Sequence, residues 1–107
     1  MIELRGYIEE NGTKPFAEWL DELDPAAAAR VTIALTRMEH GNFSNVKGAG
    51  APGLFEYRLD FGPGYGIYFG KDGDQLVILL GGGTKRRQQQ DIAEATARWT
   101  SYKRRKK

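Results

Sequence analysis

Strict alternation of apolar and polar positions marks the clearest strand in this chain. Residues 54–61 place four apolar side chains on one face, Phe55, Tyr57, Leu59 and Phe61. The pattern is typical of a strand with one face on a core, so the other face, outside the core, is expected to carry Glu56, Arg58 and Asp60. Apolar runs at residues 65–70 and 76–80 predict two further strands, joined by an Asp-Gly hairpin turn. Residues 2–8 predict a short first strand.

Helical spacing appears in two other parts of the chain. A first pair of helices is predicted by apolar side chains at Phe16, Trp19, Leu20, Leu23, Ala27, Val31, Ala34, Leu35 and Met38. Thr13 and Asp24 are the expected N-caps, each followed by a proline in the first turn, and Gly41 is the expected C-terminal stop. Residues 91–102 return to helical spacing and predict a last helix.

These elements follow the order β-α-α-β-β-β-α, with a loop expected at residues 42–53. Consecutive short hairpins favour antiparallel pairing. We therefore predict an α+β fold, in which an antiparallel sheet carries an N-terminal helical hairpin and a C-terminal helix. At 107 residues, with neither repeats nor a linker, residues 1–107 are expected to form a single domain.

Charge is distributed unevenly along the chain. Residues 1–24 hold two cations and seven acids, whereas residues 84–107 hold nine cations and two acids. The two ends are therefore expected to attract different partners. The basic tail at residues 103–107 has two open interpretations, a contact with nucleic acid or a solvated segment that aids solubility.

The composition of the chain excludes some kinds of site and argues against others. The chain contains no cysteine, which excludes disulfides and thiolate metal sites. The acidic residues lack the spacing of a metal site, so we expect no metal and no cofactor. His40, the single histidine, falls at the predicted end of the second helix, where it suits the helix dipole better than catalysis. Neither a signal peptide nor a membrane-spanning run is expected, and a cytoplasmic location follows.

Three segments together suggest a family. They are the N-terminal Pro-Phe-x-x-Trp-Leu at residues 15–20, the stretch EYRLDFGPGYGIYF, and the glycine corner GGGTKRRQQQDI. In this order they resemble the RelE/ParE toxin superfamily, specifically its HigB-like addiction module killer proteins. The resemblance implies the toxin of a type II toxin–antitoxin pair, a metal-independent mRNA endonuclease that acts on the 70S ribosome and inhibits translation. It also implies a cognate antitoxin of helix-turn-helix type, through which alone the pair would bind operator DNA.

The catalytic candidates follow from this resemblance and from the needs of RNA cleavage. The 2′-OH of RNA attacks its own phosphate, and cations that stabilise the added negative charge supply much of the catalysis. Arg58 and Lys85 are the expected phosphate contacts, with Arg suited to binding two oxygens at once. For Arg58 the alternative is a solvated side chain paired with a neighbouring acid.

Position 66 departs from the family pattern, which has arginine where this chain has Gly66. That arginine is a leading catalytic candidate in the family. Three explanations stay open: a deliberately inactivated protein, a natural inactive variant, or an enzyme whose chemistry lies elsewhere.

The RNA-binding candidates surround these positions. Gln88 matches a family glutamine, whereas Arg86 and Arg87 are additional cations, and the alternative for all three is the polar first turn of the last helix. Tyr68 shares the predicted face of Gly66 and is a candidate for stacking on an unpaired base. Asp91 suits a capping or first-turn position.

Two other functions are compatible with the same fold. The chain can be an inhibitor of DNA gyrase of the ParE type, which needs no nuclease site and tolerates Gly66. It can also be a degenerate toxin that binds antitoxin without enzymatic activity.

Overall fold

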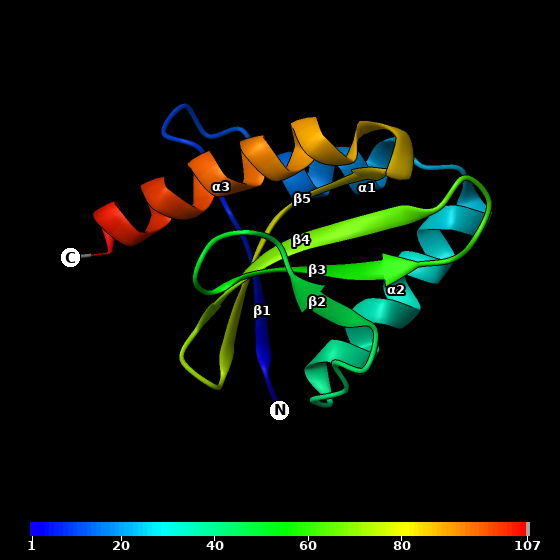
Figure 1. Cartoon of the computed structure of the whole chain (residues 1–107), viewed down its shortest axis with the longest axis horizontal. Helices are drawn as coiled ribbons and strands as arrows, with labels where there is room; N and C mark the ends of the chain where they lie inside the picture. Colours follow the sequence, from blue (N-terminus) through cyan, green and yellow to red (C-terminus); the bar gives the residue numbers. More distant parts are fainter. Residues whose placement is uncertain (107) are drawn as a thin grey trace.

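The fold is a five-stranded mixed sheet between helices, described by a computed structural model for residues 1–106 (Figure 1). The sheet order is β1-β5-β4-β3-β2. Its strands are β1 (Glu3–Gly6), β2 (Val46–Gly48), β3 (Leu54–Leu59), β4 (Tyr65–Asp72) and β5 (Leu76–Thr84). The helices are α1 (Pro15–Glu22), α2 (Pro25–Glu39) and α3 (Gln88–Arg105), the last preceded by the 3-10 turn η1 (Lys85–Arg87). The predicted α+β class is confirmed.

The sheet departs from the prediction at its two edges. The β3–β4–β5 meander is antiparallel, as the hairpin signals indicated, but β1 pairs with β5 in parallel. Two helices and the meander separate these strands in the chain, so no hairpin fixes their relative direction. The predicted loop at residues 42–53 contains β2, an edge strand too short for periodicity to reveal.

Helices cover both faces of the sheet, and this creates two apolar clusters. The helical hairpin α1–α2 packs on one face, in a cluster that includes Phe16, Val31, Met38 and Phe69. Helix α3 packs on the opposite face, in a cluster built around Tyr68, Leu80 and Trp99. Figure 1 shows α3 running across the meander.

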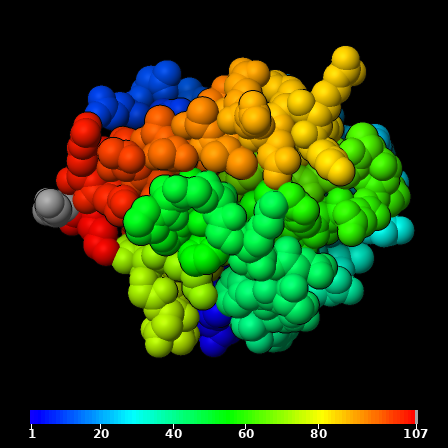
Figure 2. Space-filling model, in the orientation of Figure 1, coloured from blue at the N-terminus to red at the C-terminus, as the bar shows by residue number. Residues whose placement is uncertain are grey.

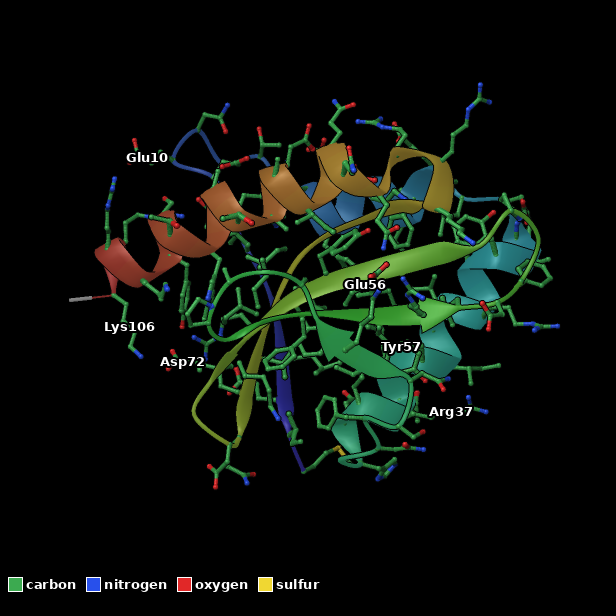
Figure 3. All side chains as sticks on the ribbon, viewed as in Figure 1. Glu10, Arg37, Glu56, Tyr57, Asp72 and Lys106 are labelled. Carbon is green, nitrogen blue, oxygen red and sulfur yellow. The ribbon has the colours of Figure 1, made fainter. Side chains whose placement is uncertain are left out.

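Because α3 covers the second face, one prediction about β3 is wrong. Glu56 does not face solvent: it is 4% exposed and lies between the sheet and α3 (Figure 3). Arg58, two residues further along the strand, lies beyond the cover of the helix, and its side chain remains 47% exposed.

The helix ends follow the predicted caps at all but one position. The Asp24 side chain accepts a hydrogen bond from the Ala27 backbone N–H at 2.9 Å, which confirms it as the N-cap of α2. Gly41 ends that helix with φ at 81°, and His40 is its C-cap. Thr13 is not the N-cap of α1: Lys14 holds that position without a side-chain cap, and Pro15 begins the helix.

Two strand glycines allow a tryptophan to approach the sheet closely. A Cβ added at Gly70 would lie 2.3 Å from the Trp99 ring, and one at Gly82 would lie 2.5 Å from Trp19. Such distances are well inside van der Waals contact, so these positions exclude larger residues. The two tryptophans thereby fix α3 and α1 on opposite faces.

Within residues 1–106, no helix has the length and apolarity needed to cross a bilayer. The same residues contain no group of three or more histidines and carboxylates arranged to bind a metal ion.

Candidate nucleic-acid interface

Three of the predicted site residues meet at one end of the meander. Arg58, Lys85 and Gln88 line a hollow of ≈ 50 Å³, together with Glu56 and others. Arg58 comes from β3, whereas Lys85 and Gln88 follow β5, and the Lys85 backbone N–H donates to the Gly64 carbonyl at 3.0 Å. On the face shown in Figure 2, the segment at η1 adjoins the β3–β4 connection. The fold therefore brings together residues that are 30 positions apart in the chain.

Glu56 also lines this hollow, and sequence analysis did not select it. Gln88 donates to its two carboxylate oxygens at 3.0 and 3.2 Å, and the Tyr68 hydroxyl donates to Oε2 at 3.4 Å. Arg58 Nε lies 3.6 Å from Oε1. The buried carboxylate thus orients both Arg58 and Gln88.

Gly66 explains how Glu56 reaches across the sheet. Gly66 pairs with Arg58 on one side and with Gly83 on the other. A Cβ at position 66 would lie 2.5 Å from Glu56 Oε2, so the carboxylate occupies space that a side chain would otherwise fill. The absence of a side chain at position 66 therefore leaves the space in which Glu56 forms its hydrogen bonds with Gln88.

Tyr68 is not a surface residue, which corrects its predicted role in base stacking. Its side chain is 1% exposed and packs in the cluster beneath α3. Burial, followed by the nearby Glu56 charge, raises the pKa of the Tyr68 hydroxyl far above its usual value. Tyr68 therefore stays protonated and serves as a hydrogen-bond donor to Glu56.

The two additional arginines do not join the hollow. Arg86 and Arg87 are both exposed on η1. Arg87 lies 3.7 Å from Asp91 Oδ1, and both line a different hollow, beside Trp19. Asp91 occupies the first turn of α3 as predicted, but it is only 8% exposed, and within residues 1–106 its Oδ2 has no hydrogen-bond partner. Burial raises its pKa, and the Arg87 charge opposes that rise.

A second hollow adjoins the first and contains cations that sequence analysis missed. It has a volume of ≈ 310 Å³, and Arg30 and Arg37 of α2 line it together with Arg58. The available signal was their separation of seven residues, which places both on one helical face. We call the four cations of the two hollows the basic edge, namely Arg30, Arg37, Arg58 and Lys85.

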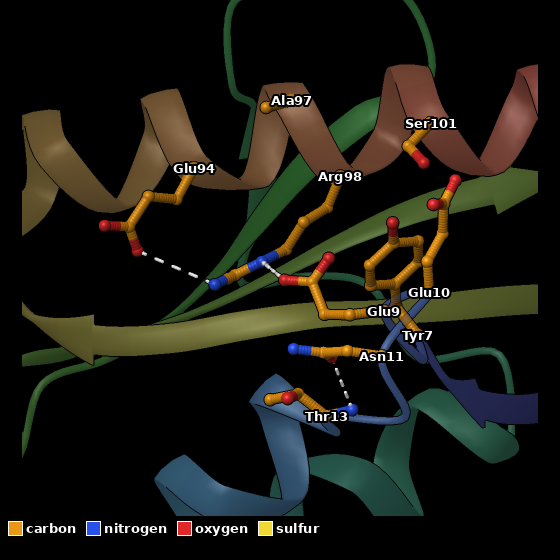
Figure 4. Close-up of a pocket in the computed structure, with 9 residues that line it drawn as sticks. All are labelled: Tyr7, Glu9, Glu10, Asn11, Thr13, Glu94, Ala97, Arg98 and Ser101. Carbon is orange, nitrogen blue, oxygen red and sulfur yellow. Dashed lines mark hydrogen bonds and ion pairs between the residues drawn. The ribbon is translucent and has the colours of Figure 1, made fainter.

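An acidic groove lies elsewhere, between α3 and the loop that follows β1 (Figure 4). Glu9, Glu10 and Glu94 line it, and its volume is ≈ 790 Å³. Arg98 bridges the groove: its Nε lies 3.4 Å from Glu9, its Nη2 lies 3.8 Å from Glu94, and its Nη1 donates to the Leu80 carbonyl at 3.0 Å. This surface repels phosphate, and its arginine holds the loop against the helix.

The basic C-terminus is helical through Arg105 and contacts its own domain. Arg105 donates to the Ile8 carbonyl at 2.9 Å, and Lys106 pairs with Asp72. Tyr102 also donates to Asp72, at 2.6 Å. The hydrogen bonds from Lys106 and then Tyr102 lower the pKa of Asp72. The predicted tail at residues 103–107 therefore includes docked cations, while Lys107 lies outside the described residues.

Comparison with known proteins shows to which family the chain belongs. No family model matches the chain. A protein of Haemophilus influenzae, described as uncharacterized, is 38% identical over 89 residues, which cover 82% of this chain and 89% of the relative. At this identity and coverage the two proteins are homologous, and this chain belongs to the same family as the Haemophilus protein.

Proposed function

We propose that this protein is the toxin of a type II toxin–antitoxin pair and cleaves mRNA on the ribosome, in the cytoplasm. The observation that carries the proposal is the convergence of Arg58 and Lys85 on one hollow from separate segments. The order of motifs that resembles the HigB-like toxins supports the same activity. Its expected partners are mRNA, the 70S ribosome and a helix-turn-helix antitoxin, with operator DNA bound only through the antitoxin.

In this proposal the RNA supplies the nucleophile and the protein supplies charge and position. The 2′-oxygen loses its proton and bonds to the adjacent phosphorus, and the bond from phosphorus to the 5′-oxygen breaks. The leaving 5′-oxygen takes a proton from water, so the products are a 2′,3′-cyclic phosphate and a 5′-hydroxyl. Arg58 and Lys85 stabilise the additional negative charge. Glu56 accepts the 2′-OH proton through Oε1, whose one hydrogen-bond donor within residues 1–106 is Gln88, so that a lone pair remains on this oxygen. No metal or cofactor takes part in these steps.

The primary test is cleavage of mRNA on programmed ribosomes by the purified protein. Arg58→Ala and Lys85→Ala should each lower the cleavage rate by about 10²–10³, the loss typical of removing one group that stabilises transition-state charge. Lys14→Ala removes an exposed cation at the start of α1 and is the matched control. Full activity in both site variants would place the chemistry elsewhere.

Position 66 offers a second test in living cells. Gly66→Arg restores the family residue and should raise toxicity, since the added guanidinium joins Arg58 and Lys85 while the flexible Glu56 carboxylate shifts to make room for the Cβ. Gly66→Ala is the matched control, because it crowds Glu56 without adding a cation. If growth under tightly controlled induction is the same for both variants and the parent protein, position 66 has no catalytic role.

One observation favours a non-enzymatic alternative. Within the first hollow, Glu56 and Asp60 balance the charges of Arg58 and Lys85, and position 66 contributes no side chain. A degenerate toxin that only binds antitoxin would have such a site, and it would bind antitoxin tightly without arresting growth.

A supercoiling assay run beside the cleavage assay tests the gyrase alternative, for which gyrase inhibition with intact mRNA is the signature.

A further inference from the structure

The second hollow is better suited to an anion than the first. Three arginines and a single acid line it, Arg30, Arg37, Arg58 and Asp60. The first hollow has two cations and two acids. Because an anion is attracted by the excess of positive charge, the hollow between α2 and the end of β3 is the stronger candidate for holding phosphate.

Its arginines are available for a ligand. Within residues 1–106, neither Arg30 nor Arg37 has a carboxylate within ion-pair distance. Arg30 is held in place by the Phe61 ring, 4.4 Å from its guanidinium carbon to the ring centroid. Arg37 is exposed on the same face of α2 (Figure 3). A guanidinium that is positioned but unpaired retains its forked donors for phosphate oxygens.

The hollow also offers an apolar surface beside these charges. Ile33 lies between the two arginines on α2 and is 49% exposed. Leu59 and Phe61 complete this surface from the end of β3. Cations next to exposed apolar groups match a nucleotide, which combines a charged phosphate with a flat base.

We infer that this hollow binds RNA, holding the backbone phosphate of a nucleotide next to the one that is cleaved. Arg58 lines both hollows, so a strand passing from Lys85 to Arg37 crosses it. That the bound nucleotide lies next to the cleaved one rests on the proposed function, whereas the binding of RNA at this hollow does not require cleavage. The bound RNA is the mRNA strand, and ribosomal RNA, which presents the same backbone, is the competing outcome that the test distinguishes.

The test is binding of a fluorescein-labelled ten-residue oligouridylate, followed by anisotropy over a range of salt concentrations. Arg30→Gln/Arg37→Gln should weaken binding at least about tenfold and reduce the salt slope by about 0.7, since the hollow holds one phosphate and each single-strand phosphate contact contributes about 0.7. Arg5→Gln/Lys14→Gln makes the same charge change at exposed positions on β1 and before α1, outside the hollow. This control should change affinity by less than about threefold.

A second arm uses vacant 70S ribosomes in place of the oligonucleotide. A loss in the oligonucleotide arm assigns the hollow to single-stranded RNA, and a loss confined to the ribosome arm assigns it to ribosomal RNA. Equal weakening by the control variant in both arms, or an unchanged salt slope, would overturn the inference. If the parent protein binds RNA at this hollow but cleaves none, the proposed nuclease function fails while the binding site stands.

Discussion

The basic edge and the acidic groove use arginine in opposite ways. In the groove, the Arg98 side chain is 22% exposed and contacts Glu9, Glu94 and the Leu80 carbonyl. At the basic edge, the Arg58 side chain is 47% exposed and pairs with Glu56 at 3.6 Å. Because its donors are already engaged, Arg98 acts as a structural clamp. Arg58 and its neighbours retain donors for a ligand. The partners and the burial of an arginine therefore distinguish a structural role from a binding role, which its residue type alone does not.

The sharpest test of this comparison replaces one arginine of the acidic groove and one arginine of the basic edge. Arg98→Ala should lower the free energy of unfolding by about 2–3 kcal/mol, because it removes charged hydrogen bonds and leaves the groove acids without their cation. Arg37→Ala should change it by less than about 0.5 kcal/mol, as expected for an exposed side chain that has no ion-pair partner among residues 1–106. Urea denaturation followed by circular dichroism measures both values.

The RNA-binding assay completes this test, because the variant with the smaller loss of stability should show the larger loss of binding. Arg37→Ala should weaken oligouridylate binding, whereas folded Arg98→Ala should bind at least as tightly as the parent. If Arg98→Ala is as stable as Arg37→Ala, the groove arginine is no clamp and the distinction fails.

Sequence patterns were sufficient for the meander and for part of the basic edge. Alternation at residues 54–61 and the Asp72-Gly73 turn gave two antiparallel pairs, because hairpin geometry is local. Arg58, Lys85 and Gln88 could be selected because they accompany recognisable glycine-rich segments. Local sequence patterns therefore identify the residues whose positions depend on neighbouring strands.

The rest depended on packing between distant segments. Glu56 looked solvent-facing because alternation indicates which residues share a face, but not whether a helix from the end of the chain covers that face. Sequence analysis did not select Arg30 and Arg37, because only the approach of β3 gives them a shared hollow. The parallel pairing of β1 was hidden for the same reason.

The C-terminal cations provide an intermediate case, with a smaller expected effect. Arg105→Gln/Lys106→Gln removes the contacts to the Ile8 carbonyl and to Asp72, and should lower the free energy of unfolding by about 1 kcal/mol. Because these cations already have partners in the domain, the salt slope of RNA binding should stay unchanged. A flatter slope would show that this end of α3 contacts phosphate and extends the basic edge.

The smallest expected effect concerns Asp91, a buried acid in the first turn of α3. Its pKa is raised from the ordinary value of 3.8, so folding disfavours its ionised form. The associated stability is present below the unfolded value and is lost as the pH rises through the folded value. Asp91→Asn does not titrate at this position, so its free energy of unfolding should exceed that of the parent near pH 7. The gain should stay under about 1 kcal/mol, since the exposed Arg87 partner is lost as well.

The pH dependence separates this explanation from a simple change in packing. The difference between Asp91→Asn and the parent should shrink as the pH falls from 7 toward 3.5, because Asp91 becomes neutral in both the folded and the unfolded chain. Urea denaturation at several pH values measures it, with Asp21→Asn as the control at an exposed position on α1. A parent protein more stable than the variant near pH 7 would mean that the Arg87 pair outweighs burial. Asp91 would then join Arg98 as part of the clamp on α3.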